Sequence, residues 1–82
     1  MRFAEFLRAA GTALYGPEWI QPIGRDLGVG PRTAQRWAAG EIEPRKPDEV
    51  RDQIRALLRE RRPAIEAECR ERIKTIAELL AA

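Results

Sequence analysis

Histidine is absent from this chain of 82 residues, and cysteine occurs once, as Cys69. Without histidine and with a single thiol, the ordinary ligand sets of structural zinc cannot be assembled, and no disulfide can form within the chain. We therefore expect no metal and no other cofactor. The sequence also has no phosphate loop and no carboxylate pair in a pocket-like pattern, so it does not indicate an enzyme or a site for a small-molecule substrate.

Long hydrophobic runs are lacking as well. The first residues, MRFAEFLRAAG, do not contain the apolar core of a signal peptide, and no stretch approaches the roughly 18 apolar residues of a membrane span. Stretches that alternate apolar and polar residues are also missing, and β-branched residues are scattered singly. These absences predict an all-α protein in the cytoplasm with no membrane partner.

The chain has only a small excess of positive charge, which is unevenly distributed along the sequence. The formal net charge is +2, and it comes from residues 1–46, which carry seven basic and five acidic side chains. All of the basic residues except Lys46 and Lys74 are arginine, whose planar fork suits carboxylates, phosphates and guanine edges. With 44% hydrophobic residues the chain is expected to fold, although a domain of this size is near the lower limit for a self-sufficient core.

Apolar residues at three- and four-residue steps predict four helices. The expected ranges are 2–14, with Gly11 as a weak point, 22–27, 31–39 and 47–61. Each of the last three begins with proline, which is well tolerated at the first helical position. Near residue 62 the pattern leaves two possibilities open, because Pro63 either kinks one long helix or separates a fifth one.

Beyond Pro63 the apolar residues form one narrow stripe at helical spacing: Ile65, Cys69, Ile73, Ile76 and Leu80. The rest of that segment is lined with acid–arginine pairs four residues apart, which predicts a wet outer face. The stripe either packs back on the core of the same chain or meets its own copy in a two-fold dimer. We expect the segment 63–82 to be an amphipathic dimerisation helix.

Residues 20–40 have the features that two short helices need when they cross at a tight turn. Gly24 leaves space where the second helix presses on the first, and Gly28 can take the left-handed conformation of the turn. The expected inner face consists of Ile23, Leu27, Ala34 and Trp37, with Val29 under the turn.

The remaining side chains of the second short helix point outward. Arginine pairs bidentately with guanine and glutamine with adenine, which makes Arg32, Gln35 and Arg36 candidates to read base edges in the major groove. Thr33 can donate to phosphate or touch a thymine methyl group. Pro31 leaves the next amides free to face a phosphate. The alternative is that these residues form the solvated face of an ordinary helical bundle.

The stretch IQPIGRDLGVGPRTAQRWAAGE resembles the helix-turn-helix of the lambda-repressor and Cro type, and the similarity covers roughly residues 14–62. The resemblance implies a bundle of four to five helices with a DNA-binding domain at 1–62. This chain differs in having Gly24 where alanine is usual and Ala34 where valine or isoleucine is usual. The groove-facing residues that the resemblance implies are Gly30, Pro31, Arg32, Gln35 and Arg36, with Gln21 near the DNA backbone.

We therefore expect a sequence-specific transcriptional regulator, a dimeric repressor of a phage or mobile-element operon with a palindromic operator. Arg45 and Lys46 follow the reading helix in a loop with no acid after Glu43, and they are expected to contact phosphate. One alternative is a phage DNA-packaging or assembly component. Another is a helical protein-interaction module such as an antitoxin.

Overall fold

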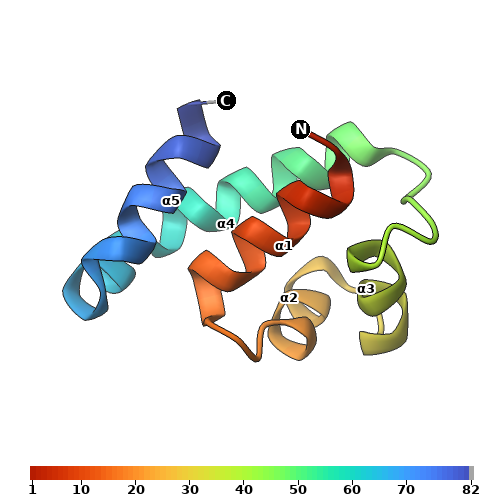
Figure 1. The fold of residues 1–82 in the computed structure, drawn as a ribbon, viewed down its shortest axis with the longest axis horizontal. Coiled ribbons are helices and arrows are strands. Elements are labelled where there is room, and N and C mark those ends of the chain that lie inside the picture. Colours follow the sequence, from red (N-terminus) through yellow and green to blue (C-terminus); the bar gives the residue numbers. More distant parts are fainter. Residues whose placement is uncertain (82) are drawn as a thin grey trace.

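Five helices form the framework of the protein. The computed structural model describes residues 1–81, and these residues contain no strand. The helices are α1 (Phe3–Tyr15), α2 (Ile20–Leu27), α3 (Pro31–Ala38), α4 (Pro47–Glu68) and α5 (Arg70–Ala81). The prediction of an all-α protein is confirmed. Figure 1 shows that α3 and α5 lie at opposite ends of the molecule, and the other views agree.

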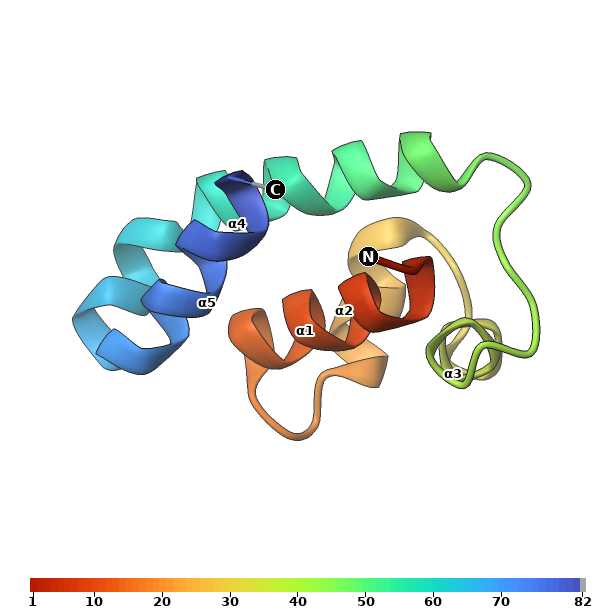
Figure 2. The ribbon, with the colours of Figure 1, turned by 45° about the horizontal axis from the view of Figure 1, so that its top comes forward.

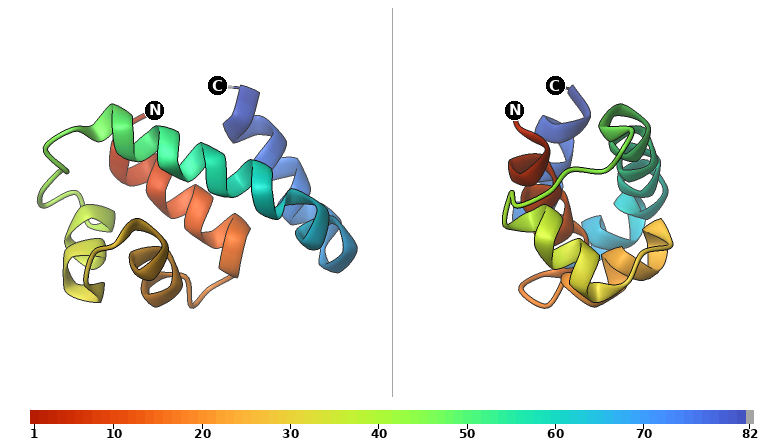
Figure 3. Two further views of the ribbon diagram at one scale, coloured as in Figure 1. Left: turned by 180° about the vertical axis from the view of Figure 1, so that it is seen from behind. Right: turned by 90° about the vertical axis from the view of Figure 1, so that its right-hand side faces the viewer.

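The core is built around α1, which contacts each of the other four helices. Its buried face carries the apolar residues whose spacing predicted the helix, and α4 runs alongside it (Figure 3). No polar or charged side chain is buried among residues 1–81. The largest fully buried side chains are Leu7, Ile23, Ile54, Leu58 and Ile76. With the buried residues of α3 included, all five helices contribute to one apolar cluster.

Gly11 lies in the middle of α1 and is buried. A Cβ atom at this position would come within 2.2 Å of Cε3 in the indole ring of Trp19. Trp19 is itself buried, directly before α2, as the sequence indicated for a core or interface residue. The glycine that weakens the helix on its own therefore provides the space in which the tryptophan packs.

The first helices begin and end close to their expected positions, with one correction. Helix α2 begins at Ile20 and not at Pro22. Pro22 occupies the third helical position, where the N–H group that proline lacks would also have had no partner within the helix. Trp19 and Ile20, expected in a lead-in, thus stand at the cap and the first turn.

The C-terminal region differs more from the expectation. Helix α4 continues through Pro63, so the residue that was expected to kink or break the chain lies inside a helix of 22 residues. The break comes instead at Cys69, whose φ of −157° and ψ of 114° are extended. Helix α5 then folds back against α1 and α4 (Figure 2). A single helix over residues 63–82 is wrong, and residue 82 lies outside the described residues.

Because α5 folds back, most of the apolar stripe beyond Pro63, which was expected to form a dimer interface, lies against the core of the same chain. Ile65 and Ile76 are only 4% and 0% exposed, because they pack within the same chain. Ile73 and Leu80 are partly buried against the same core, and Cys69 is half-buried at the break. Folding back buries Ile76 in the common core, and burying such a side chain contributes about 1.5–3 kcal/mol. For this stripe, the structure favours the alternative of packing on the core.

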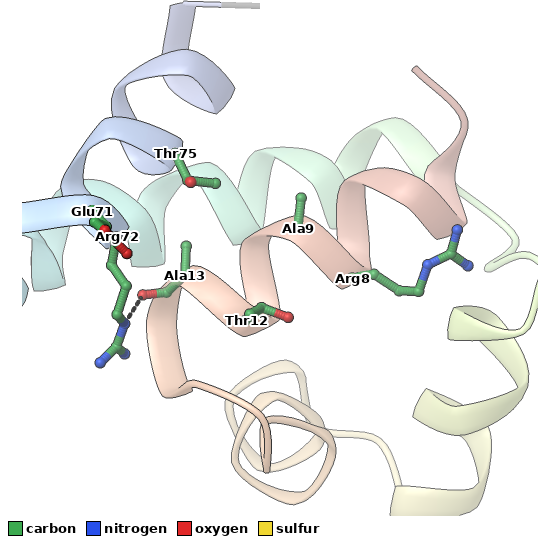
Figure 4. A pocket seen from close by; sticks show the side chains of 7 residues that line it. All are labelled: Arg8, Ala9, Thr12, Ala13, Glu71, Arg72 and Thr75. Carbon is green, nitrogen blue, oxygen red and sulfur yellow. Dashed lines mark hydrogen bonds between the residues drawn. The ribbon is translucent and has the colours of Figure 1, made fainter. Parts of the chain in front are cut away.

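Arg72 fastens α5 to the end of α1. Its Nε–H donates to the carbonyl oxygen of Ala13 at 2.8 Å, and a terminal amino group donates to the carbonyl of Leu14. Figure 4 shows the side chain reaching from α5 to the last turn of α1. Helix α1 has no basic residue in its own last turn, so this guanidinium supplies the positive charge that favours a helix C-terminus. The expected boundary at residue 62 falls inside α4, and the segment beyond it belongs to the shared core.

Candidate nucleic-acid interface

A tight glycine turn joins α2 to α3. Gly28 has a φ of 73°, in the left-handed region that glycine adopts without strain. Its N–H donates to the carbonyl of Arg25 at 3.3 Å, and the N–H of Val29 donates to the carbonyl of Gly24 at 2.8 Å. This pair of bonds is the Schellman arrangement, which satisfies two carbonyls at the end of a helix. Val29 then packs against the core under the turn, as the sequence predicted.

Gly24 is needed for the same turn. A Cβ atom there would lie 2.9 Å from the carbonyl oxygen of Val29, which is closer than a real Cβ atom approaches. The separation from the Cβ atom of Ala34 would be 3.8 Å, an ordinary contact. The small residue was expected to make room for the second helix. It makes room mainly for the backbone of the turn.

The inner face of α3 is held by apolar contacts and one hydrogen bond. Ala34, Trp37 and Ala38 are buried, which confirms the interpretation of Trp37 as a core residue. The ring of Trp37 meets that of Phe3 edge-on, with centroids 5.8 Å apart and an interplanar angle of 76°. Arg8 in α1 donates to the carbonyl of Ala38 at the end of α3. These contacts fix which side of α3 can face outward.

The outer face of α3 carries three exposed polar residues, Arg32, Gln35 and Arg36, which we call the α3 row. They line a shallow depression of about 380 Å³ together with Ala39 and Glu41. Thr33 is half-buried and less accessible than the row. The guanidinium groups of the row therefore project away from the hydrophobic core.

Glu41 adds an acid beside the α3 row, which the sequence reasoning missed. Helix α3 ends like α2: Gly40 has a φ of 75°, and its N–H donates to the carbonyl of Trp37 at 3.1 Å. The N–H of Glu41 donates to the carbonyl of Arg36, also at 3.1 Å. One carboxylate oxygen of Glu41 lies 3.5 Å from Nε of Arg36, and the two side chains are 61% and 54% exposed. Gly40 was noted as a helix end, and its resemblance to Gly28 could have revealed this pairing.

The first turn of α3 presents free backbone donors. Gly30 caps the helix in an extended conformation without a side-chain hydrogen bond, and Pro31 follows at the first helical position. The first bond of the helix runs from the N–H of Ala34 to the carbonyl of Gly30 at 3.1 Å. The amides of Arg32 and Thr33 come before that bond, so they have no partner within the helix.

Gln21 lies close to this first turn. A depression of about 240 Å³ is lined by Gln21, Arg25, Val29 and Pro31, so it joins the exposed face of α2 to the start of α3. Arg25 was not among the residues singled out from the sequence. Its position four residues after Gln21 on α2 places both on one face, which is the signal that could have found it.

Arg45 and Lys46 are exposed, but they lie at the far end of the connector, beside the start of α4. They line a separate depression of about 670 Å³. The loop itself has no acid after Glu43, but the ammonium of Lys46 lies 3.7 Å from the carboxylate of Glu49 in the first turn of α4, a pairing that the sequence reasoning missed. Both of these side chains are more than two-thirds exposed, so the pair contributes little to stability.

Helix α2 is tied to α1 and α4 by a polar cluster. The hydroxyl of Tyr15 donates to the carboxylate of Asp26, and Arg61 lies 3.4 Å from the other oxygen of that carboxylate. The guanidinium of Arg61 also sits over the ring of Tyr15, 5.0 Å from its centroid. Burial, followed by the hydrogen bond to Asp26, raises the pKa of Tyr15 to about 12. The cluster anchors the helix that carries the turn.

Comparison of the chain with models of protein families, with curated proteins and with solved structures found no match. Among residues 1–81, no three cysteine or acidic side chains are grouped so that they could hold a metal ion. None of the helices in this part of the chain is long and apolar enough to cross a membrane. The chemistry of this site is therefore argued from its own geometry.

Proposed function

We propose that this protein binds double-stranded DNA sequence-specifically, with α3 lying in the major groove, and that it acts as a transcriptional regulator. The observation that carries the proposal is the α3 row, three long polar side chains exposed on a short helix whose opposite face is buried in the core. Two glycine turns and the contacts of Trp37 hold that helix in place. This arrangement supports a helix-turn-helix made of α2 and α3.

The dimensions and chemistry of α3 support this use. A helix of eight residues is about 12 Å long, and the major groove is about 12 Å wide. Arg32 and Arg36 offer forked donors for guanine, and Gln35 offers the donor and acceptor that adenine requires. These three side chains read base edges in the proposed complex.

The neighbouring residues contact the sugar–phosphate backbone and set the register. At the first turn of α3, beside Gly30 and Pro31, the amides of Arg32 and Thr33 face a phosphate at the positive end of the helix dipole. Gln21 and Arg25 contact the backbone from α2. Arg45 and Lys46 reach a more distant phosphate from the connector.

Two copies bind one operator in this proposal, because a single eight-residue reading helix spans too few base pairs for high specificity. Adjacent half-sites on one face of the duplex are about 34 Å apart. Helices α3 and α5 lie at opposite ends of the molecule (Figure 1). A dimer joined through α5 would therefore place its two α3 helices farther apart than one turn of DNA. Half-sites one turn apart would require the two copies to touch nearer α3. The half-site spacing of the selected operator distinguishes these two dimers.

The biological role that fits such a regulator is repression of a phage or mobile-element operon by occupancy of a palindromic operator. A DNA-packaging or assembly component would instead form a ring larger than a dimer. A protein-interaction module would keep its partner in the presence of excess random duplex. Both alternatives are therefore separated from the regulator by simple measurements of assembly and competition.

Selection of bound duplexes from a random library is the experiment that tests the proposal. We expect a symmetric consensus. Arg36→Ala should lower affinity for it by about 1–3 kcal/mol and relax the preference at one position of each half-site. The matched control is Arg62→Ala, which removes the same charge from an exposed position on α4. Absence of a consensus, or equal effects of the two substitutions, would contradict the assignment.

A further inference from the structure

Glu41 raises a question that base-reading arginines alone do not answer. A carboxylate on a surface that approaches DNA is repelled by the phosphates, and an exposed ion pair offsets this by only about 0–1 kcal/mol. Glu41 nevertheless stands beside the α3 row, 3.5 Å from Arg36. A hydrogen bond from the DNA to this carboxylate would offset the repulsion.

The end of α3 fixes Glu41 relative to Arg36. The Gly40 turn bonds the N–H of Glu41 to the carbonyl of Arg36, so backbone as well as side chain couples the two residues. A hydrophobic contact frequently joins the corresponding positions of a Schellman motif. At the end of α2 the equivalent residue, Val29, packs against the core. At the end of α3 an acid and an arginine occupy the two positions.

The Arg36–Glu41 pair offers a defined order of hydrogen-bonding groups. Glu41 faces Nε of Arg36, which leaves the two terminal amino groups of the guanidinium free to donate. The pair therefore offers two donor groups from Arg36 and an acceptor from Glu41 next to them. Along the major-groove edge of a G·C pair, guanine N7 and O6 are acceptors and the cytosine N4 amino group is a donor. An A·T pair presents acceptor, donor and acceptor, which does not match.

We infer that Arg36 and Glu41 together read one G·C base pair, with Arg36 donating to guanine and Glu41 accepting from the N4 amino group of cytosine on the other strand. This inference rests on the proposed function. It makes Glu41 a specificity-determining residue, because its carboxylate rejects base pairs that have an acceptor or a methyl group at that place. The cost of bringing an acid to DNA is then offset at the correct sequence alone.

The test uses the full chain and the duplex consensus obtained by selection. The base pair that Arg36→Ala relaxes is identified first, and if no pair is relaxed, the proposed function fails before Glu41 is tested. In a second duplex the cytosine of that pair is replaced by pyrimidin-2-one, which lacks the N4 amino group and leaves guanine N7 and O6 in place. The wild-type protein should bind this duplex about tenfold more weakly, the loss expected for one charge-assisted hydrogen bond.

Two variants separate recognition from charge. Glu41→Ala should bind the two duplexes with affinities that differ much less than those of the wild type. Its preference for G·C over A·T at that position should become weaker but persist, because Arg36 still donates to guanine. Glu43→Ala removes the same charge from another exposed acid nearby, and it should retain the wild-type response. If Glu41→Ala and Glu43→Ala both raise affinity for every duplex and leave the base preference unchanged, Glu41 only repels DNA. That result would overturn the inference while leaving DNA binding by α3 intact.

Discussion

Replacing Gly11 by alanine should destabilise this protein, although alanine is the better helix former. In an unconstrained helix interior the exchange is favourable by about 1 kcal/mol. Here the new methyl group would lie 2.2 Å from Cε3 and 2.5 Å from Cδ2 of Trp19, which is more than about 1 Å inside ordinary contact. The indole has to move away from α1. Overpacking of this kind costs about 1–3 kcal/mol and occasionally more.

An approach of 2.2 Å to a buried ring places the overpacking cost in the upper part of that range, about 2–3 kcal/mol. The expected net loss is therefore about 1–2 kcal/mol, after the gain in helix propensity of about 1 kcal/mol is subtracted. For a domain of this size, that corresponds to a fall in Tm of roughly 5–15 °C. Thermal and urea unfolding followed by far-UV circular dichroism measure it directly. Thr12→Ala is the matched control, because Thr12 is exposed on the same helix and gains propensity without meeting the indole. It should raise stability slightly.

A double substitution isolates the steric cause. When Trp19 is also changed to alanine, the clash disappears, so Gly11→Ala should become stabilising by about 1 kcal/mol. The comparison is made in a stabilising osmolyte, because losing a buried tryptophan costs about 3–5 kcal/mol. If Gly11→Ala stabilises the protein whether or not the tryptophan is present, the reasoning about this contact is refuted.

Three further predictions concern the turn, the polar cluster and the connector. Gly28→Ala should cost about 1–2 kcal/mol in urea unfolding because the residue has a φ of 73°, whereas no loss would mean that the turn relaxes. Burial raises the pKa of Tyr15 to about 12, whereas the phenol of the unfolded chain titrates near 10. The free energy of unfolding should therefore fall as pH rises from 10 towards 12, because the unfolded chain releases the phenolic proton first. Tyr15→Phe should reduce this decline when unfolding is measured at alkaline pH. Lys46→Ala should weaken binding to all duplexes alike and reduce the salt slope by about one unit, and an unaltered slope would remove Lys46 from the phosphate contacts.

The first three helices were predictable because their signals are local. Proline, glycine and the spacing of apolar residues determine structure within a few residues of the chain. Pro31 begins a helix, and Gly28 and Gly40 adopt the positive φ that ends one. The role of Gly11 was not predictable, since it depends on a ring that arrives from the next element. The same applies to Arg8 and Arg72, whose bonds to carbonyls join residues 30 or more positions apart.

The C-terminal segment shows where periodicity misleads. The steps from Ile65 to Leu80 run through Cys69 as if the helix were continuous, and nothing local marks the break there. The reason for the break is tertiary: folding back buries Ile76 and Leu79 against the core, which a straight helix would leave in water. The candidate site was easier to predict, because the buried residues of α3 determine which of its side chains face outward. Glu41 was missed because its pairing depends on the turn after α3.

The way α3 is attached has a consequence for its motion. Within residues 1–81 it packs only on α1 and α2, whereas α1 contacts all four of the other helices. An element with few neighbours opens at a smaller free-energy cost than the whole domain. Its backbone amides should exchange with deuterium sooner than those of α1, and ligand binding should slow them. The segment that meets the DNA would then open more readily than α1, so that part of the binding energy is spent on ordering it.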